Sequence, residues 1–285
     1  MSHGRSRPGA RLWVFLPAIA LLGVGTTARS DPRPLWELGL GAGAVAIPDY
    51  PGSSITHAYP IPVVYFIYRG EFFRSDRDGV RGLLLNREYV ELSVSAGLSV
   101  PVNSNKDSAR YGMPNLHPVV ELGPALNLHL WKSADRHVRL DLRLPVRAGL
   151  TIESDPQTIG WIFGPRLDVD IDGRGRARDS SAGVLVGPDY ASQRYHEYFY
   201  GVAPQYATPE RPAYQAPGGY GGTWATAYIS HRGQKVWFGA YITQGWLANA
   251  AFATSPLMRR DGSLSGGFGV AWMLGRSKHL VESIN

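Results

Sequence analysis

Cysteine is absent from the 285 residues, and charged side chains make up only 18% of them. The absence of cysteine excludes disulfide scaffolds, thiolate metal sites and cysteine nucleophiles. The low charge, beside 44% hydrophobic residues, excludes a disordered and solvating chain. The 34 glycines and 21 prolines disfavour long helices, because both residues are poor in helix interiors. We therefore expect many short strands joined by turns.

The N-terminus has the pattern of a secretory signal peptide. Arg5, Arg7 and Arg11 precede the apolar run Leu12–Val24, and small residues follow up to Ala28. The run of 13 residues is shorter than the roughly 20 that a transmembrane helix needs. Cleavage after Ala28 lowers the formal charge from +6 to +3 by removing the three arginines. The mature chain therefore gives no indication of a nucleic-acid partner.

Apolar and polar side chains alternate with a period of two along the mature chain. In 89–100 most even positions are apolar, and in 138–148 valines and leucines alternate with charged residues. This period is typical of β-strands, whose successive side chains point to opposite faces. The other segments with this pattern are 36–46, 59–68, 79–85, 120–131, 161–172, 181–187, 222–230, 235–243 and 265–274.

Two all-β architectures fit these segments: a soluble sandwich or lipocalin-like barrel, and a barrel of the bacterial outer membrane. Segment lengths near ten residues suit strands tilted across a membrane. Trp36, Trp131, Trp161 and Trp272 lie at or near segment ends, where such barrels carry aromatic girdles. Short connections alternate with long ones, like periplasmic turns and outer loops. We therefore predict an antiparallel transmembrane β-barrel.

The eleven segments leave the strand number open, because bacterial barrels have even numbers. Phe72–Ser75 can begin a further strand, so we expect about 12 strands, with 10 as the alternative. The predicted organisation is a signal peptide in 1–28, a barrel in 29–275 that includes a long tyrosine-rich loop in 188–221, and a short C-terminal tail in 276–285.

Short motifs follow one another in order over the mature chain. They include Pro48-Asp49-Tyr50-Pro51-Gly52-Ser53, Tyr59-Pro60-Ile61-Pro62, Gly112-Met113-Pro114, Glu121-Leu122-Gly123-Pro124, Gly164-Pro165-Arg166-Leu167 and Tyr195-His196-Glu197-Tyr198-Phe199-Tyr200. Together they resemble the MipA/OmpV family (MltA-interacting protein). The resemblance implies a β-barrel in the bacterial outer membrane, surrounded by its lipid. It also implies, as partners, a periplasmic murein transglycosylase and a murein synthase; other members of the family are described as osmoregulated or adhesion-related.

The segments 138–148 and 161–172 carry complementary charges. If they form a hairpin, a register that pairs Arg143 with Asp168 also pairs Arg139 with Asp172. We interpret the set as an ion-pair network that rigidifies or plugs the lumen, with a selectivity filter as the alternative. The set comprises Arg139, Asp141, Arg143, Arg147, Arg166, Asp168, Asp170 and Asp172.

The segment 188–221 holds seven of the fifteen tyrosines. Its prolines and glycines exclude a continuous strand, and its rings are too many for a loose solvated loop. We expect it to fold onto or into the barrel, with its rings buried and its hydroxyls hydrogen-bonded. The alternative is a surface of Tyr195, Tyr198, Tyr200 and Tyr206 that binds a glycan or a protein.

No pattern specifies a catalytic, cofactor or metal site. Asp170-x-Asp172-Gly173 lacks the other ligands of a calcium loop. The polar faces that contain Ser93 and His129 do not fix the geometry of a Ser–His hydrolase. We therefore predict a non-enzymatic structural or scaffolding barrel without a cofactor. A narrow channel for small solutes and, second, an outer-membrane lipid hydrolase are the alternatives.

Overall fold

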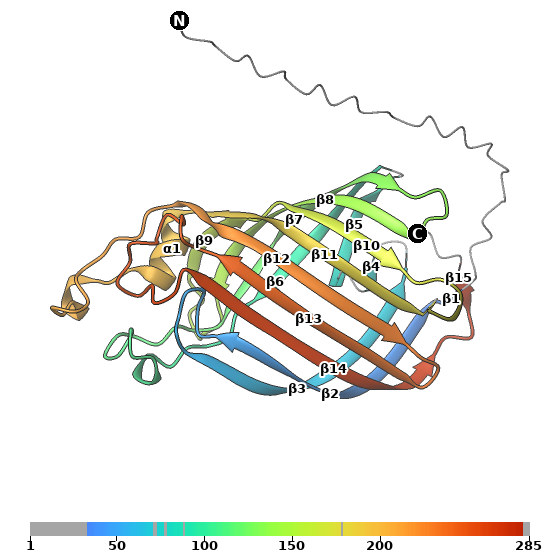
Figure 1. The fold of residues 1–285 in the computed structure, drawn as a ribbon, viewed down its shortest axis with the longest axis horizontal. Coiled ribbons are helices and arrows are strands. Elements are labelled where there is room, and N and C mark those ends of the chain that lie inside the picture. The colour runs from blue at the N-terminus through green and yellow to red at the C-terminus, as the bar shows by residue number, and fades with distance from the viewer. Residues whose placement is uncertain (1–32, 71–72, 77–78, 88, 178, 282–285) are drawn as a thin grey trace, which may run out of the picture.

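In the computed structural model, one antiparallel sheet curves into a barrel, with long loops and a helix at one end and the chain ends at the other (Figure 1). The structure describes residues 33–70, 73–76, 79–87, 89–177 and 179–281. The predicted signal peptide lies outside the described residues. In the part that is described, no helix is both long enough and apolar enough to cross a membrane.

Thirteen strands form the barrel sheet. A separate pair, β1 (Arg33–Pro34) and β15 (Leu280–Val281), joins the two ends of the described chain, so part of the predicted tail forms a short strand. The barrel strands are β2 (Trp36–Pro48), β3 (Thr56–Arg69), β4 (Phe73–Asp76), β5 (Gly79–Asn86), β6 (Val90–Leu98), β7 (Val119–Lys132), β8 (Val138–Thr151), β9 (Thr158–Phe163), β10 (Arg166–Asp172), β11 (Ser180–Ala191), β12 (Gly219–Arg232), β13 (Val236–Trp246) and β14 (Gly262–Arg276).

β9 and β10 share one position in the wall, because both pair with β8 on one side and with β11 on the other. Gly164 and Pro165 separate them, and proline has no N–H to continue a ladder. The thirteen strands therefore occupy twelve positions, which agrees with the expected barrel of about 12 strands. β4 is the additional strand expected near Phe72–Ser75, although Phe72 itself lies outside the described residues.

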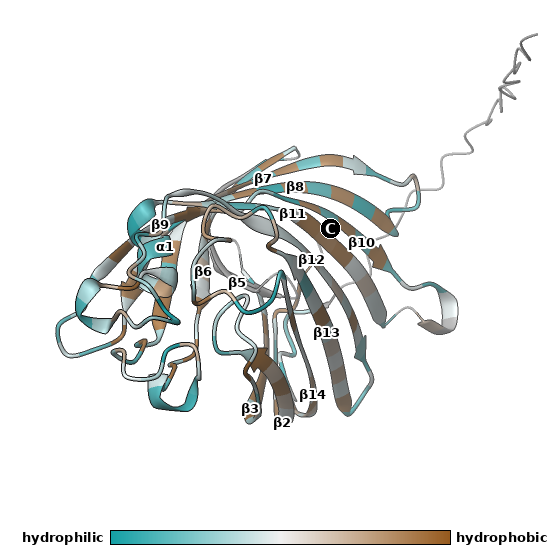
Figure 2. Ribbon diagram, turned by 60° about the vertical axis from the view of Figure 1, so that its left-hand side comes forward, coloured by the Kyte–Doolittle hydropathy of each residue, from teal (hydrophilic) through white to brown (hydrophobic). Residues whose placement is uncertain are grey.

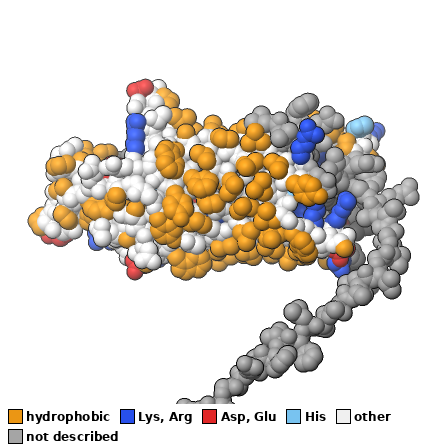
Figure 3. Space-filling view, turned by 90° about the horizontal axis from the view of Figure 1, so that it is seen from above, with side chains coloured by type: hydrophobic (Ala, Val, Ile, Leu, Met, Phe, Trp, Pro, Cys, Tyr) orange, Lys and Arg blue, Asp and Glu red, His pale blue; other side chains and the backbone are white. Residues whose placement is uncertain are grey.

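The outward face of the barrel is apolar. Hydropathy alternates along the strands (Figure 2), and hydrophobic side chains form a broad band along the side of the barrel (Figure 3). Exposed tryptophans lie at both edges of this band. Trp36, Trp131 and Trp272 are near the end that holds the chain termini, and Trp161 and Trp246 are near the other end. An apolar band between two aromatic levels is typical of a barrel that spans a membrane.

The loops opposite the chain ends pack together as a cap, formed by residues 49–55, 101–118, 192–218 and 247–261. Its apolar residues are the main buried core of the described chain, which therefore lies above the barrel. The helices are η1 (Ser104–Lys106), α1 (Gln193–Tyr200) and η3 (Pro204–Tyr206) in the cap and η2 (Gly175–Ala177) in a turn at the other end. The core comprises Tyr50, Val102, Ala109, Met113, Leu116, Tyr200, Val202, Ala216, Leu247, Ala250, Phe252 and Leu257.

Candidate functional site: a charged lumen beneath a loop cap

The oppositely charged residues of β8 and β10 meet inside the barrel, but two residues away from the predicted register. Asp170, not Asp172, lies opposite Arg139. Arg139 lies 3.3 Å from Asp170, directly opposite, and two further ion pairs run diagonally: Arg143 contacts Asp168, and Arg139 lies 3.7 Å from Asp172. Diagonal neighbours on adjacent strands are within reach of long side chains. The predicted Arg–Asp contacts can therefore form although the predicted register is wrong.

Neighbouring strands complete this cluster. The Tyr228 hydroxyl of β12 donates to Asp170, and His129 Nδ1 of β7 lies 2.9 Å from Asp141 Oδ1 of β8. Asp168 and Asp170 are only 1% and 2% exposed. Buried carboxylates need a paired cation or hydrogen-bond donors, because desolvation of an isolated charge is costly. The cluster therefore ties four strand positions together across the inner wall.

Two of the predicted charges belong to a second cluster, beneath α1. Arg147 Nε lies 3.1 Å from Glu121, and the Tyr195 hydroxyl donates to the same carboxylate at 2.6 Å. Arg166 lies 2.6 Å from Asp189 on β11. Burial and the neighbouring Glu121 carboxylate raise the pKa of Tyr195, which keeps its hydroxyl protonated as a donor. The eight predicted charges therefore form two clusters at different heights.

A third cluster, which sequence reasoning missed, lies at the end with the short turns. Glu37 is 2% exposed, lies 3.1 Å from Arg69 and accepts a hydrogen bond from Arg232 Nε. Its signal in the sequence is that Glu37 is the only charged residue in the strand Trp36–Pro48. A single acid among glycine and apolar residues therefore marks a lumen contact.

The four tyrosines that the sequence analysis gave as an alternative binding surface lie within the cap or pack against it. Tyr200 is 3% exposed, and its ring stacks on Phe252 with centroids 3.6 Å apart. Tyr200 therefore cannot contribute to an exposed binding surface, which corrects the alternative interpretation of these residues. Tyr198 and Tyr206 pack against the cap core. The hydroxyls of Tyr195, Tyr198 and Tyr200 donate to Glu121, to the His117 carbonyl and to the Pro51 carbonyl.

Charged groups are also buried within the cap. Arg110 is 3% exposed and donates to the Phe199 carbonyl at 3.0 Å. The Asp107 carboxylate accepts the Ser53 hydroxyl at 2.9 Å. Burial lowers the pKa of the Arg110 guanidinium, because desolvation disfavours its charged form. Burial also raises the pKa of the Asp49 carboxyl, whose Oδ1 lies 3.2 Å from Nε2 of His57. These contacts join loops that are far apart in the sequence.

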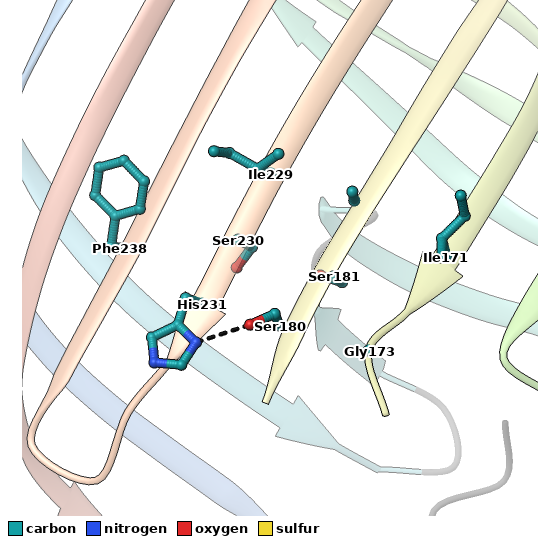
Figure 4. Close-up of a pocket in the computed structure, with 9 residues that line it drawn as sticks. Ile171, Gly173, Ser180, Ser181, Ile229, Ser230, His231 and Phe238 are labelled. Carbon is teal, nitrogen blue, oxygen red and sulfur yellow. Dashed lines mark hydrogen bonds between the residues drawn. The ribbon is translucent and has the colours of Figure 1, made fainter. Parts of the chain in front are cut away.

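A groove of about 310 Å³ lies on the outer face of the barrel, near the short turns (Figure 4). Ile171, Ile229 and Phe238 are exposed along it, and Ser180 Oγ lies 2.9 Å from His231 Nδ1. Hydrolysis by a Ser–His pair also needs a group that orients the histidine. Among the described residues, the His231 ring has a hydrogen-bond partner only in Ser180, so no third group orients it. This pair is therefore not a complete triad.

Ser93 and His129, which the sequence analysis weighed as parts of a hydrolase, have different partners among the described residues. Ser93 accepts a hydrogen bond from Asn127 at 3.3 Å, whereas His129 contacts Asp141. Within the described ranges, no group of three or more His, Cys, Asp or Glu side chains could hold a metal ion. The charged clusters can therefore brace the lumen.

The fold and the clusters define a class of protein: an antiparallel β-barrel with an apolar outer band, ion pairs in its lumen and a packed cap over one mouth. A sequence profile described as MltA-interacting protein MipA matches residues 40–274, and the chain belongs to this family. No curated protein matches the chain.

Three solved structures that the chain resembles in fold are named as outer-membrane proteins. A bacterial polysaccharide outer membrane secretin is 10% identical, with 86% of this chain and 100% of that chain covered and a TM-score of 0.41. Outer membrane phospholipase A from Escherichia coli is 14% identical, with 85% and 98% covered and a TM-score of 0.34. OprG from Pseudomonas aeruginosa is 8% identical, with 86% and 96% covered and a TM-score of 0.22. Likeness at this level carries no argument about activity or ligand.

Proposed function

We propose that this outer-membrane β-barrel is a non-catalytic scaffold that binds murein-degrading and murein-synthesising enzymes at its periplasmic face. Family membership carries the proposal, because the family is described by its interaction with MltA. The murein transglycosylase and murein synthase that the sequence resemblance implied are the expected partners.

The geometry supports a scaffold rather than a pore. Three ion-paired clusters occupy the inner wall, and a packed cap covers one mouth. Short turns and chain ends are typical of the periplasmic side of such barrels, so the end with the short turns is available to periplasmic proteins. Among the residues that the structure describes, the exposed basic ones at this end, which form a basic rim, are Arg87, Lys132, Arg136, Arg174, Lys235, Arg276 and Lys278. A basic rim favours a partner with an acidic surface.

Binding between the purified barrel and a purified lytic murein transglycosylase tests the proposal. Reversal of three rim charges, by Lys132→Glu, Arg136→Glu and Lys235→Glu together, should weaken binding at least about tenfold, or ~1.4 kcal/mol. The matched control reverses three exposed charges of the cap, Lys106, Arg194 and Arg260, and should bind like the wild type. Absence of binding by the wild-type barrel to murein enzymes would overturn the proposal.

Conductance separates the scaffold from the alternative of a narrow channel for small solutes. The purified barrel in a planar bilayer should give no stable conductance steps, because ion-paired clusters occupy the inner wall and the cap covers one mouth. Stable steps would favour the channel. Steps that increase when Arg139→Ala opens the β8–β10 cluster would place the conducting path in the lumen itself.

A further inference from the structure

A second groove, of about 340 Å³, lies on the outer face of β13, β14 and β2, at the ends of these strands that are nearer the cap. The three strands are neighbours in the sheet and lie side by side (Figure 1). Two residues of the lining, Ile242 and Leu264, are strongly exposed on the outer face of the barrel. The strand register places Gly266 in one row with Ile242 and Ala46. The groove is therefore open to the surroundings of the barrel and not to its lumen.

Small residues form the floor of the groove. Ala46 and Gly266 carry one methyl group or none, whereas Leu264 and Phe268, the outward neighbours of Gly266 along β14, carry large apolar side chains. A Cβ added at Gly266 would lie 2.9 Å from the Tyr241 carbonyl oxygen, so the groove reaches down to the backbone of β13. Its volume is near the lower limit of the range of about 300–1,000 Å³ for ligand sites. These dimensions suit one flexible chain and not a folded partner.

The groove lies just inside the edge of the outer apolar band. Trp246 is exposed at this edge and pairs with Gly262, and Leu264 and Gly266 follow toward the middle of β14. Aromatic girdles lie at the interfaces of the membrane with water, and the cap is at the end opposite the short periplasmic turns. The floor of the groove is therefore in the hydrocarbon of the outer leaflet, and the residues that precede Gly262 are at the height of the lipid headgroups.

Arg260 supplies a positive charge at this height. Among the described residues that line the groove, it is the only charged one. Its backbone N–H donates to the Gly52 carbonyl at 3.0 Å, whereas its guanidinium is exposed and has no ion-pair partner in the described ranges. An arginine can bind a phosphate group through two parallel N–H donors. The groove that contains Ser180 and His231 (Figure 4) has no arginine or lysine in its lining.

We propose that the groove of β13, β14 and β2 binds a phosphorylated lipid of the outer leaflet, with an acyl chain over Gly266 and Ala46 and a phosphate group on Arg260. The surrounding lipid is as apolar as the groove, so apolar contact alone gives little preference for one lipid. The charge of Arg260 therefore selects a lipid that carries phosphate. The site is independent of the murein enzymes, which are expected at the opposite end of the barrel.

Native mass spectrometry of the intact barrel in detergent, titrated with diphosphorylated lipid A, tests the contact with Arg260. The wild type should bind this lipid more tightly than lipid A without phosphate groups. Arg260→Gln should lower the affinity at least about tenfold, because a charge-assisted contact is lost. Arg259→Gln is the matched control: Arg259 is also exposed but does not line the groove, so this variant should bind like the wild type. Equal affinity of the wild type and Arg260→Gln, or of the two forms of the lipid, would overturn the proposal.

Filling the groove tests the position of the acyl chain. Ala46→Phe places a ring over the floor and should lower the affinity for lipid A severalfold. Ala182→Phe fills the groove of Figure 4 in the same way and should leave the affinity unchanged. Heat-modifiable migration in gels verifies that each variant is folded. An unchanged affinity in folded Ala46→Phe would contradict the site, and a wild-type dimer that Ala46→Phe converts to monomers would make a second copy of this chain the occupant instead.

Discussion

Individual buried charges set the stability of the lumen, and Glu37 is the sharpest case. Its carboxylate serves both Arg69 and Arg232. Glu37→Gln should lower the free energy of unfolding by about 3 kcal/mol, because two arginines then face each other without a counter-charge. Urea unfolding in detergent, followed by tryptophan fluorescence, measures the change. Glu210→Gln, at an exposed position of the cap, is the control and should change stability little. Equal losses in both variants would contradict the assigned role.

At this scale the sequence predicts which side chains face inward, but not their partners. The alternation in 138–148 places Arg139, Arg143 and Arg147 on one face. It does not show that Arg147 meets Glu121, which also accepts the Tyr195 hydroxyl near the cap, while Arg143 meets Asp168 lower down. Partners depend on strand register and on loops that fold back over the mouth, and neither is encoded in a period of two.

Among the elements, helix α1 depends most on its surroundings. Its eight residues are too few for a stable isolated helix. Ser192 caps it by accepting the Tyr195 N–H, and His196, 2% exposed, fixes its inner side. His196 Nδ1 lies 2.8 Å from the Pro217 carbonyl, and its ring centroid lies 4.8 Å from that of Phe252. The attachment of α1 to the barrel therefore depends on a buried and neutral imidazole.

Acidification should loosen α1. Burial lowers the pKa of His196 below its ordinary value of 6.5. The neutral imidazole therefore stabilises the cap above that value, and this contribution is lost as the pH falls through the lowered pKa. Hydrogen exchange of the α1 amides, corrected for the intrinsic rate, should be faster at about pH 5 than at about pH 7.5. His196→Gln keeps a donor for Pro217 but does not titrate, so its corrected exchange should not depend on pH. The same pH dependence in this variant would exclude His196 as the cause.

Most strands were predictable from the sequence, whereas the break between β9 and β10 and the packing of the loops were not. The alternation located most of the barrel strands, and the odd number of eleven segments indicated one more strand near Phe72–Ser75. The predicted strand 161–172 is two strands, because Gly164 and Pro165 break its ladder. The sequence indicated a packed loop in 188–221 but not the other loops that complete the cap, since its core joins residues as distant as Tyr50 and Leu257, 207 positions apart.

On the scale of the whole molecule, hydrophobic residues have two separate destinations. One set faces outward in the band between the two levels of tryptophans. The other forms the cap core above the barrel. The barrel wall encloses the ion-paired charges of the lumen. This is the reverse of a soluble barrel, in which the apolar side chains fill the interior. Stability should therefore respond to outward substitutions according to their depth in the membrane.

Arginine substitutions along β14 test that depth dependence. Phe268, 54% exposed, lies near the middle of the strand, and Leu274, 62% exposed, lies close to its periplasmic end. Phe268→Arg should cost about 2–4 kcal/mol relative to Phe268→Ala, because the charge then sits near the bilayer midplane; Leu274→Arg should cost about 0–1 kcal/mol relative to Leu274→Ala. Reversible folding into lipid vesicles, titrated with urea, measures both differences. Each arginine variant is compared with the alanine variant at the same site, so the free energy lost with the original side chain cancels. The remaining difference in free energy reports the cost of the arginine at that depth. Equal costs at the two positions would mean that β14 does not cross the bilayer along its length.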